Sequence, residues 1–377
     1  MDSVISTFKE RIRQAAADGK KLRIQGGNTK HFYGEHKASF AVLNTREYAG
    51  VVSYEPSELV VTVRGGTLLA ELEQLLSTRG QCLAYEPPHF GASTTVGGMV
   101  AAGLAGPARA SVGGVRDHVL GAKLINGLGE ELTFGGQVMK NVAGYDVSRV
   151  LAGSMGTLGI ITEVSLKVLP VAPAEATLVC HLSQAQALSQ LHLWGAQALP
   201  LNASVWLSDS CSGATNGVLY VRLRGAVAAV EAACPRMMAD VHELGGSAAR
   251  MDAPQAAQHW SATREQSLPF FADALTDMCV WRLSLPQTAP LLDLPYPACV
   301  EWHGGLRWLR APVSAAAQLR QAAQQAGGHA TLFRRAQTVT LDAKVFSELP
   351  QVQQRIQREL QKQFDPHGVF NTGRLGI

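Results

Sequence analysis

The chain has 377 residues, of which 46% are hydrophobic and 17% are charged, and its net charge at pH 7 is +3. This composition excludes an intrinsically disordered chain, and the length predicts a globular protein with two domains. The sequence contains no basic stripe and no run of five like charges, so we expect no nucleic-acid partner.

Neither the N-terminus nor the least charged span predicts a membrane segment. The first 14 residues carry charges among their apolar residues, unlike the uninterrupted apolar segment of a signal peptide. The span 90–108 is long enough to cross a membrane, but five glycines and Pro107 disfavour a helix there. We therefore expect a cytoplasmic protein without a transmembrane segment, which associates with a membrane at most peripherally, through a complex.

The six cysteines are far apart and form no C-x-x-C pair. Iron–sulfur clusters usually take closely spaced thiolates from one loop, so this spacing predicts no cluster in the chain itself. Buried, unreactive thiols are the alternative that we favour, and we expect no metal site.

The first part of the chain alternates between helical and strand patterns. Apolar residues at helical spacing predict a helix over 4–19 and another over 68–80. The expected strands and remaining elements are a strand at 21–27, a strand at 58–66, a hairpin at 118–136, a short helix at 146–153 and a strand at 159–170. A linker is expected over 169–176, where the composition changes.

The second part has a different pattern. Strands are expected at 176–182 and 217–225, and alanine-rich helices at 226–246 and 314–328. Strands separated by helices, without glycine-rich loops, predict an α+β domain with one face of its sheet covered. A last helix over 348–364 places Val352, Ile356, Leu360 and Phe364 on one side, and the tail "DPHGVFNTGRL" follows it.

Four glycine-rich segments could contact a ligand: "IQGGNTK" (24–30), "TTVGGMVAAG" (94–103), "SVGGVRD" (111–117) and "GSMGTLGII" (153–161). Glycine lets the backbone approach a ligand and direct successive N–H groups at it, which suits a diphosphate. An ordinary tight turn explains any single segment, but not four of them. The sequence matches neither a P-loop nor the G-x-G-x-x-G turn of a Rossmann fold, so we expect a long phosphate-bearing ligand contacted by several loops.

Together these segments, with "GGVRDHVLGAKLINGLGE", "VMKNVAGYDVSRVLAGSMGTLGIITEVSLKVLP" and the tail "FDPHGVFNTGRL", resemble a known family. They are similar to the flavin-binding domain of the vanillyl-alcohol-oxidase or PCMH type, and within it to the FAD-binding E subunits of bacterial glycolate oxidase. The resemblance implies an α+β fold with a two-subdomain PCMH-type FAD-binding domain over 1–170. It also implies a smaller α/β cap domain over 171–340, and a C-terminal helix and tail over 341–377 that return to the FAD domain.

The resemblance also implies a set of FAD contacts. Those at the diphosphate are Gly26, Gly27, Asn28 and Thr29. Those along the flavin and diphosphate are Thr94, Thr95, Gly97 and Gly98, preceded by Pro88 and His89 and continued by Gly113, Gly114 and Arg116. Those at the adenine end are Gly156, Gly159, Ile160 and Ile161. An apolar loop is then expected, because it is buried against the ligand and its backbone is satisfied there.

Catalytic residues are harder to predict. Oxidation of a 2-hydroxy acid needs a base near the hydroxyl and a cation near the carboxylate, and the nearest polar cluster contains Lys140, Asn141 and Tyr145. Helix capping and local hydrogen bonds explain that cluster equally well. His31 follows the first glycine loop, and some relatives attach flavin through a nearby histidine. The match is poor here, so we expect non-covalent FAD.

Two departures from the resembling family concern the cap and the last glycine loop. Catalytic relatives carry a metal motif of the form H-x-G-D-G-N-x-H, where this chain has "EWHGGLRWLR" and keeps only His303. They usually have Glu where Met155 stands. A structural histidine is the alternative that we favour for His303. Trp302, Trp308 and Leu309 could form a patch for a partner subunit or belong to the core, and the core is favoured.

The function implied is that of an FAD-binding subunit in a multi-subunit glycolate dehydrogenase or oxidase. Such a complex would oxidise glycolate, a small 2-hydroxy acid, to glyoxylate. Its expected partners are a catalytic FAD-linked subunit and an iron–sulfur subunit that receives the electrons. Two alternatives stay open: a self-sufficient FAD-linked D-2-hydroxy-acid dehydrogenase of the D-lactate type, and a structural partner that has lost FAD.

Overall fold

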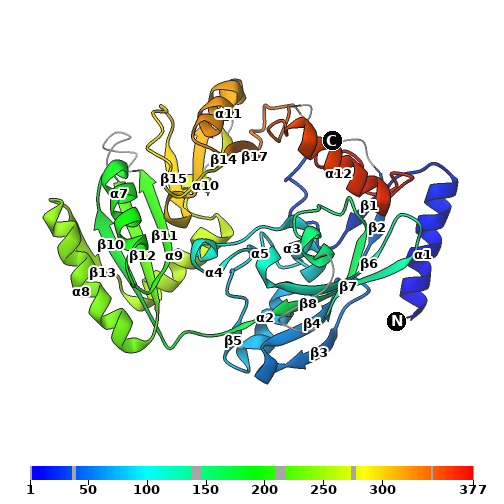
Figure 1. Ribbon diagram of the computed structural model, residues 1–377, viewed down its shortest axis with the longest axis horizontal. Coiled ribbons are helices and arrows are strands. Elements are labelled where there is room, and N and C mark those ends of the chain that lie inside the picture. The colour runs from blue at the N-terminus through cyan, green and yellow to red at the C-terminus, as the bar shows by residue number, and fades with distance from the viewer. Residues whose placement is uncertain are drawn as a thin grey trace. The chain divides into compact units, whose positions relative to one another are not determined.

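The computed structural model describes residues 2–35, 40–136, 146–208, 217–272, 277–340 and 343–376. The chain divides into two compact units, whose elements are labelled in Figure 1. Unit 1 comprises Met1–Ala105, Gly113–Val171 and Glu348–Ile377. Unit 2 comprises Gly106–Val112 and Ala172–Ser347. The short segment 106–112 therefore belongs with the second unit, although both of its neighbours in sequence belong to the first.

Unit 1 is built on a five-stranded antiparallel sheet with the strand order β3-β4-β8-β6-β7. Its strands are β3 (Val51–Glu55), β4 (Val60–Arg64), β8 (Ile160–Lys167), β6 (Val119–Ile125) and β7 (Glu131–Gly135). A parallel pair, β1 (Leu22–Gln25) and β2 (Ala41–Asn44), and a short antiparallel pair, β5 (Gln81–Cys82) and β9 (Leu169–Pro170), complete the strands.

The central strands alternate as their sequences predict. Val164 and Leu166 of β8 are fully buried on one face, while Ser165 bonds Thr62 of β4 on the other at 2.8 Å between hydroxyl oxygens. The predicted hairpin is also confirmed, because β6 and β7 pair antiparallel from Gly121–Gly135 to Ile125–Glu131. A period of two in side-chain direction is enough to assign these strands.

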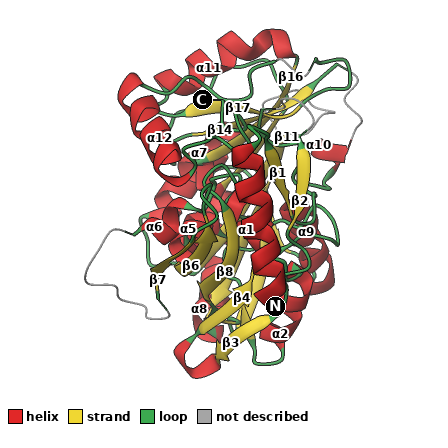
Figure 2. Cartoon of the chain, turned by 90° about the vertical axis from the view of Figure 1, so that its right-hand side faces the viewer, coloured by secondary structure: helices red, strands yellow, loops and turns green. Residues whose placement is uncertain are grey.

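The helices of unit 1 are α1 (Asp2–Ala17), α2 (Leu69–Ser77), α3 (Val96–Ala102), α5 (Val115–His118), α6 (Val147–Val150) and α12 (Gln351–Phe364), with a 3₁₀ turn η1 at Pro56–Glu58. Helix α1 buries Ile5, Phe8 and Ile12 in one apolar cluster with Ile160 of β8 and Phe370 of the tail. Figure 2 shows α1 as a helix that faces the viewer. The first helix and the last residues thus share one core.

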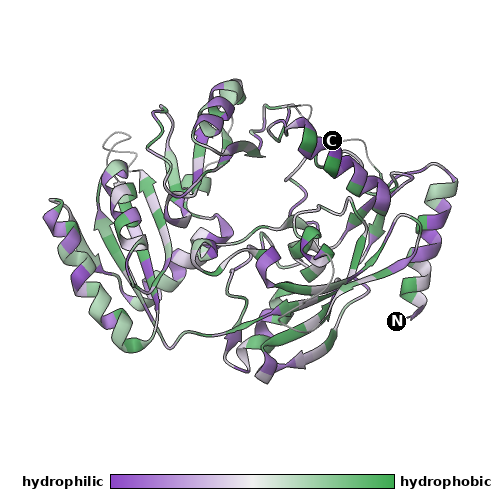
Figure 3. Cartoon of the chain, in the orientation of Figure 1, coloured by the Kyte–Doolittle hydropathy of each residue, from purple (hydrophilic) through white to green (hydrophobic). Residues whose placement is uncertain are grey.

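Helix α12 is buried at only one of its ends. Its hydropathy alternates along its length in Figure 3, as expected for an amphipathic helix. Phe364 is buried and packs near Phe134, with ring centroids 5.8 Å apart, but Val352 and Ile356 are 62% and 60% exposed. The side that carries these residues is therefore buried at its C-terminal end and exposed in the first half of the helix.

Unit 2 is built on an eight-stranded antiparallel sheet with the order β13-β10-β12-β11-β15-β16-β14-β17. The strands are β10 (Ala174–His181), β11 (Leu201–Ser208), β12 (Gly217–Gly225), β13 (Ser247–Arg250), β14 (Cys279–Ser284), β15 (Ala298–Glu301), β16 (Leu306–Ala311) and β17 (His329–Arg334). The helices are α4 (Arg109–Val112), α7 (Gln184–Gly195), α8 (Val227–Glu243), α9 (Ala253–Glu265), α10 (Pro269–Ala272) and α11 (Ala316–Gln325), with 3₁₀ turns η2 (Trp302–Gly304) and η3 (Val313–Ala315).

The core of unit 2 forms on one face of this sheet. Helices α7, α8 and α11 contribute Trp194, Met237 and Leu319, which pack with strand residues such as Trp206 and Trp281. All five of these side chains are 1% exposed or less. The prediction of mixed helices and strands is confirmed. The expectation that only one face of the sheet is covered is wrong, because α9 packs on the other face, where Trp260 Nε1 donates to Thr177 Oγ1 of β10 at 2.9 Å.

Two further sequence expectations concern membranes and thiols. Within the described ranges, no helix is long and apolar enough to cross a membrane. The five described cysteines are free, and all except the half-buried Cys82 are buried. Burial raises the pKa of Cys180 to about 12, so its thiol stays protonated at neutral pH.

Candidate functional site: a cationic glycine-loop pocket in unit 1

The loop after β1 packs directly on the loop before α3. A Cβ added at Gly27 would lie 1.7 Å from the carbonyl oxygen of Ser93, so only glycine fits there. Ser93 Oγ donates to the Gly27 carbonyl oxygen at 2.8 Å, and the hydroxyl oxygens of Thr29 and Thr94 are 2.7 Å apart. Two of the predicted glycine segments thus form one structure.

Successive backbone N–H groups of the first loop have no acceptor. Among the described residues, the N–H groups of Gly27, Asn28 and Thr29 donate no hydrogen bond. Asn28 has a left-handed backbone, with a φ of 61°. Left-handed residues within a loop can turn consecutive N–H groups toward one point, which is how backbone nests bind anions. Three consecutive N–H groups that bond no described residue can donate to the oxygens of an anionic ligand.

The two glycines at the start of α3 have different roles. Gly97 N–H donates to the Gly65 carbonyl oxygen at 2.8 Å, and a Cβ there would lie 2.9 Å from the same oxygen. Gly97 therefore allows α3 to pack closely against the end of strand β4. Gly98 faces the pocket instead, and its N–H donates to Thr95 Oγ1, the N-cap of the helix, at 3.2 Å.

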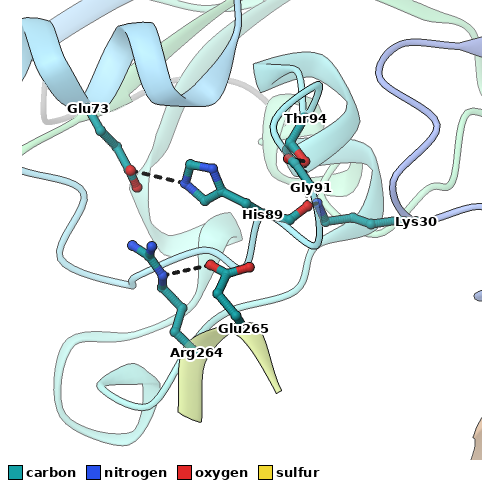
Figure 4. Close-up of polar contacts among 7 residues, drawn as sticks. All are labelled: Lys30, Glu73, His89, Gly91, Thr94, Arg264 and Glu265. Carbon is teal, nitrogen blue, oxygen red and sulfur yellow. Dashed lines mark hydrogen bonds and ion pairs between the residues drawn. The ribbon is translucent and has the colours of Figure 1, made fainter. Parts of the chain in front are cut away.

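The loop 85–94 joins the first glycine loop through a lysine. Lys30 Nζ donates to the carbonyl oxygen of His89 at 3.0 Å, and the Thr94 hydroxyl donates to the same oxygen. Figure 4 shows that the His89 ring points away from this contact, toward Glu73 of α2. The His89 Nε2 and Glu73 Oε2 atoms are 3.0 Å apart. The backbone of His89 therefore supports the pocket loop, while its imidazole is paired elsewhere.

These loops enclose a pocket of about 110 Å³. The predicted residues that line it are Gly26, Gly27, Asn28, Thr29, Thr94, Thr95 and Gly98. Other lining residues belong to the predicted glycine-rich segments but were not named as FAD contacts: Ile24, Gln25, Lys30, Ala101, Ala102 and Met155. The lining residues outside those segments are Arg23, His31, Tyr33, Asn371 and Arg374. The lining includes three cationic side chains and no carboxylate, so the pocket is suited to an anion.

Two arginines from opposite ends of the chain meet at His31. Arg374 donates to the carbonyl oxygens of His31 and Tyr33 at 2.8 and 2.5 Å, and its Nη1 is 3.4 Å from His31 Nδ1. Arg23 Nη1 is 3.3 Å from His31 Nε2. The Nε of Arg23 is buried without a hydrogen-bond partner among the described residues. A buried guanidinium donor without an acceptor is costly unless a ligand supplies one.

The C-terminal tail holds this arrangement together. Asn371 Nδ2 donates to the carbonyl oxygen of Met155 at 2.6 Å, and Asn371 Oδ1 accepts from the Ile24 N–H at 3.0 Å. Leu22 N–H donates to the Val369 carbonyl oxygen at 2.7 Å, so the tail runs beside β1. Met155 and Asn371 also have positive φ values, 51° and 38°. Left-handed non-glycine residues are strained and gather at functional sites.

The remaining predicted contacts do not line this pocket. They are Pro88, His89, Gly97, Gly113, Gly114, Arg116, Gly156, Gly159, Ile160 and Ile161. Gly114 N–H bonds Asp117 Oδ2 at 2.8 Å, Arg116 is exposed, and Ile160 is buried in the α1 cluster. A Cβ at Gly159 would lie 2.4 Å from the Ile125 carbonyl oxygen, so this glycine packs β8 against β6. Lys140, Asn141 and Tyr145 lie outside the described residues.

In unit 2, His303 is enclosed by serines. Its Nδ1 is 2.9 Å from Ser204 Oγ, its Nε2 is 3.2 Å from Ser111 Oγ, and its own N–H donates to Ser204 Oγ at 3.0 Å. Burial lowers the pKa of His303 to about 4, so the ring is neutral. In the described parts of the chain, no three His, Cys, Asp or Glu side chains gather as a metal site would need. Trp302, Trp308 and Leu309 are all buried.

The comparisons define the class of protein first. Residues 5–135 match the family model described as an FAD binding domain. The solved structure of an alkyldihydroxyacetonephosphate synthase superposes with a TM-score of 0.68 over 97% of this chain and 74% of that chain, at 16% sequence identity. The fold comparison confirms the predicted α+β fold, and the family model supports an FAD-binding domain with FAD as its cofactor.

The particular family follows from sequence relatives. The glycolate oxidase subunit GlcE of Escherichia coli is 42% identical over 368 residues, which are 97% of this chain and 95% of that protein. The D-lactate dehydrogenase of Anaerostipes hadrus is 35% identical over 34% of this chain and 27% of that protein. The glycolate oxidase subunit GlcD of Bacillus subtilis is 30% identical over 37% and 30%. This chain belongs to the family of the glycolate oxidase subunit GlcE.

Proposed function

We propose that this chain is the FAD-binding subunit of a multi-subunit glycolate oxidase that oxidises glycolate to glyoxylate. We propose a catalytic FAD-linked subunit and an iron–sulfur subunit as its partners, with electrons passing to the latter. The similarity to GlcE along 97% of the chain supports the assignment to such a complex. The complex would work in the cytoplasm or peripherally at a membrane.

The glycine-loop pocket supports a position for the FAD diphosphate. Among the described residues, the N–H groups of Gly27, Asn28 and Thr29 have no acceptor, and Arg23 and Lys30 add positive charge beside them. A diphosphate supplies acceptor oxygens and two negative charges, so it satisfies both deficits at once. This combination of unbonded N–H groups and cations in a pocket without carboxylates is the observation that carries the proposal.

We propose that the cofactor is held without a covalent bond. The two ring nitrogens of His31 already face Arg23 and Arg374, which leaves the imidazole in the role of a support for the pocket. When bound, FAD supplies the hydride acceptor for C2 of a 2-hydroxy acid. The groups that handle the hydroxyl proton stay a prediction, with Lys140, Asn141 and Tyr145 as candidates.

A visible absorption spectrum of the purified chain, before and after anaerobic glycolate, tests the function. Flavin bands in the chain alone support the cofactor site, and bleaching by glycolate in the reconstituted complex supports the reaction. Bleaching of the isolated chain by D-lactate in preference to glycolate would instead favour the self-sufficient dehydrogenase. A colourless chain that assembles with its partners and takes up no added FAD would overturn the proposal.

A substitution at Gly98 tests the site separately. A Cβ at Gly98 would meet only Thr95 Oγ1, at 3.1 Å, and a Glu three residues after the Thr95 N-cap completes a capping box. Gly98→Glu should therefore keep the helix but place a carboxylate in the anion pocket, and we expect FAD loading to be lost. Gly98→Gln adds the same bulk without the charge and should retain more FAD. Gly195→Glu, where a Cβ meets nothing within 4 Å, is the control for an added surface charge.

A further inference from the structure

Two arginines converge on one buried indole in unit 2, outside the glycine-loop pocket. The Cζ atoms of Arg109 and Arg282 lie 4.4 and 5.4 Å from the ring of Trp302. The indole is 4% exposed, and its Nε1–H donates to the Gly106 carbonyl oxygen at 2.9 Å. Residues from α4, β14 and η2, far apart in sequence, therefore meet at one aromatic side chain.

The backbone that presents Trp302 is strained. Trp302, His303 and Gly304 have consecutive φ values of 54°, 55° and 100°. For a non-glycine residue this left-handed conformation carries a free-energy penalty, and such residues persist where the surroundings fix them. The two serine contacts of His303 supply that restraint, because Ser204 and Ser111 hold both sides of the imidazole. The position of the Trp302 ring is therefore fixed.

Arg282 places a positive charge beside the Trp302 ring. It is half-buried on β14, between Trp308 of β16 and Thr331 of β17. Within the described part of the chain, its guanidinium makes no hydrogen bond and no ion pair. The nearby Glu301 is buried, and its Oε1 accepts from Trp308 Nε1 at 2.6 Å instead. Burial raises the pKa of Glu301 to about 7, so this carboxyl compensates the arginine only in part near neutral pH.

We propose that Arg282, which lies over the Trp302 ring together with Arg109, binds the carboxylate of a small organic acid. A guanidinium that makes no hydrogen bond to the described residues can offer a carboxylate two parallel hydrogen bonds. The inference rests on the proposed function for the identity of the acid, which is a 2-hydroxy acid of the size of glycolate.

Binding of glycolate, and of oxalate as an acid that cannot be oxidised at a C2–H bond, tests this site directly. All six tryptophans of the chain lie in unit 2, so their fluorescence reports ligand binding there. We expect the full-length chain to bind both acids, and Arg282→Gln to weaken binding at least about tenfold, as expected for the loss of a bidentate contact. Arg282→Lys keeps the charge without the fork and should recover only part of the affinity.

The matched control is Arg310→Gln, a half-buried arginine on the neighbouring strand β16. It should bind glycolate like the unmodified chain. Equal glycolate affinity of Arg282→Gln and the unmodified chain would overturn the site. So would equal binding of chloride and glycolate, because it would indicate attraction by charge alone. Flavin absorbance, measured on the same samples, shows whether FAD is bound. A failure of the acid-binding site can therefore be distinguished from a failure of the FAD assignment.

Discussion

The two histidines that the sequence singles out lie in opposite surroundings. His31 in unit 1 faces a guanidinium at each ring nitrogen, Arg23 at 3.3 Å and Arg374 at 3.4 Å. His303 in unit 2 faces a serine hydroxyl at each ring nitrogen. The first belongs to a pocket rich in positive charge, and the second belongs to a closed network of neutral groups.

The difference teaches how the function of a polar residue depends on what its neighbours leave unsatisfied. Around His31, the Arg23 Nε and three loop N–H groups have no acceptor among the described residues, which leaves donors for the anionic ligand that we propose there. Around His303, Ser204 can accept the backbone N–H and donate to Nδ1, and Ser111 can accept from Nε2. That network is complete without a ligand, so His303 acts by fixing Trp302.

The largest expected effect concerns the glycine loop beside His31. Gly27→Ala would place a methyl group 1.7 Å from the Ser93 carbonyl oxygen, a rigid backbone atom. We expect the two loops to separate, at a cost of about 3 kcal/mol in the free energy of unfolding, and FAD loading to be lost. Flavin absorbance and thermal unfolding by circular dichroism measure both effects. Gly195→Ala is the matched control, and an unchanged flavin content in Gly27→Ala would contradict the packing of these loops.

The second prediction tests the closed network of His303 by its pH dependence. Burial lowers its pKa from 6.5 to about 4, so below pH 6.5 the unfolded state binds a proton that the folded state does not. Stability is therefore lost as the pH falls, by about 2 kcal/mol between pH 6.5 and 5 for this one group. We expect His303→Gln to lose about that much less stability over this interval than the unmodified chain, as measured by urea unfolding with tryptophan fluorescence.

A substitution with the opposite expected effect on the pH dependence of stability is the control for that measurement. Burial raises the pKa of Glu301 from 4.5 to about 7, so the folded state gains a proton, and stability, as the pH falls through this range. Glu301→Gln removes this gain and should steepen the loss of stability in acid. If the two variants shift the pH profile in the same direction, the burial argument is wrong.

Sequence patterns predicted the parts of the molecule that depend on neighbours in the chain. Side-chain alternation gave β8, and the Gly27 and Gly98 loops followed from glycine spacing, because both signals are local. The exposure of Ile356 in α12 could not be predicted, because an amphipathic pattern does not say how much of a helix the rest of the chain covers.

The cations of the pocket were missed for the same reason. Arg23 lies on a short strand and Arg374 in the tail, and nothing within either segment distinguishes these arginines from exposed ones. Only the pairing of Leu22 with the tail brings them to His31. The family resemblance implied that the tail returns to the FAD domain but assigned it no ligand contact, and the asparagine and arginine in "FNTGRL" were the available signal.

The smallest expected effect concerns Arg374, the arginine of the C-terminal tail. Arg374 donates to the carbonyl oxygens of His31 and Tyr33 and adds a charge to the pocket lining, so we propose that it orders the loop and also attracts the diphosphate. We expect Arg374→Gln to weaken FAD binding about tenfold, the loss typical of one charge-assisted contact, while the fold is kept. Arg358→Gln, on the exposed face of α12, is the matched control. Titration of the apo chain with FAD distinguishes two roles: a loss of affinity that high salt removes indicates charge, whereas one that persists in salt indicates loop order. Unchanged affinity in Arg374→Gln would mean that the tail arginine supports neither.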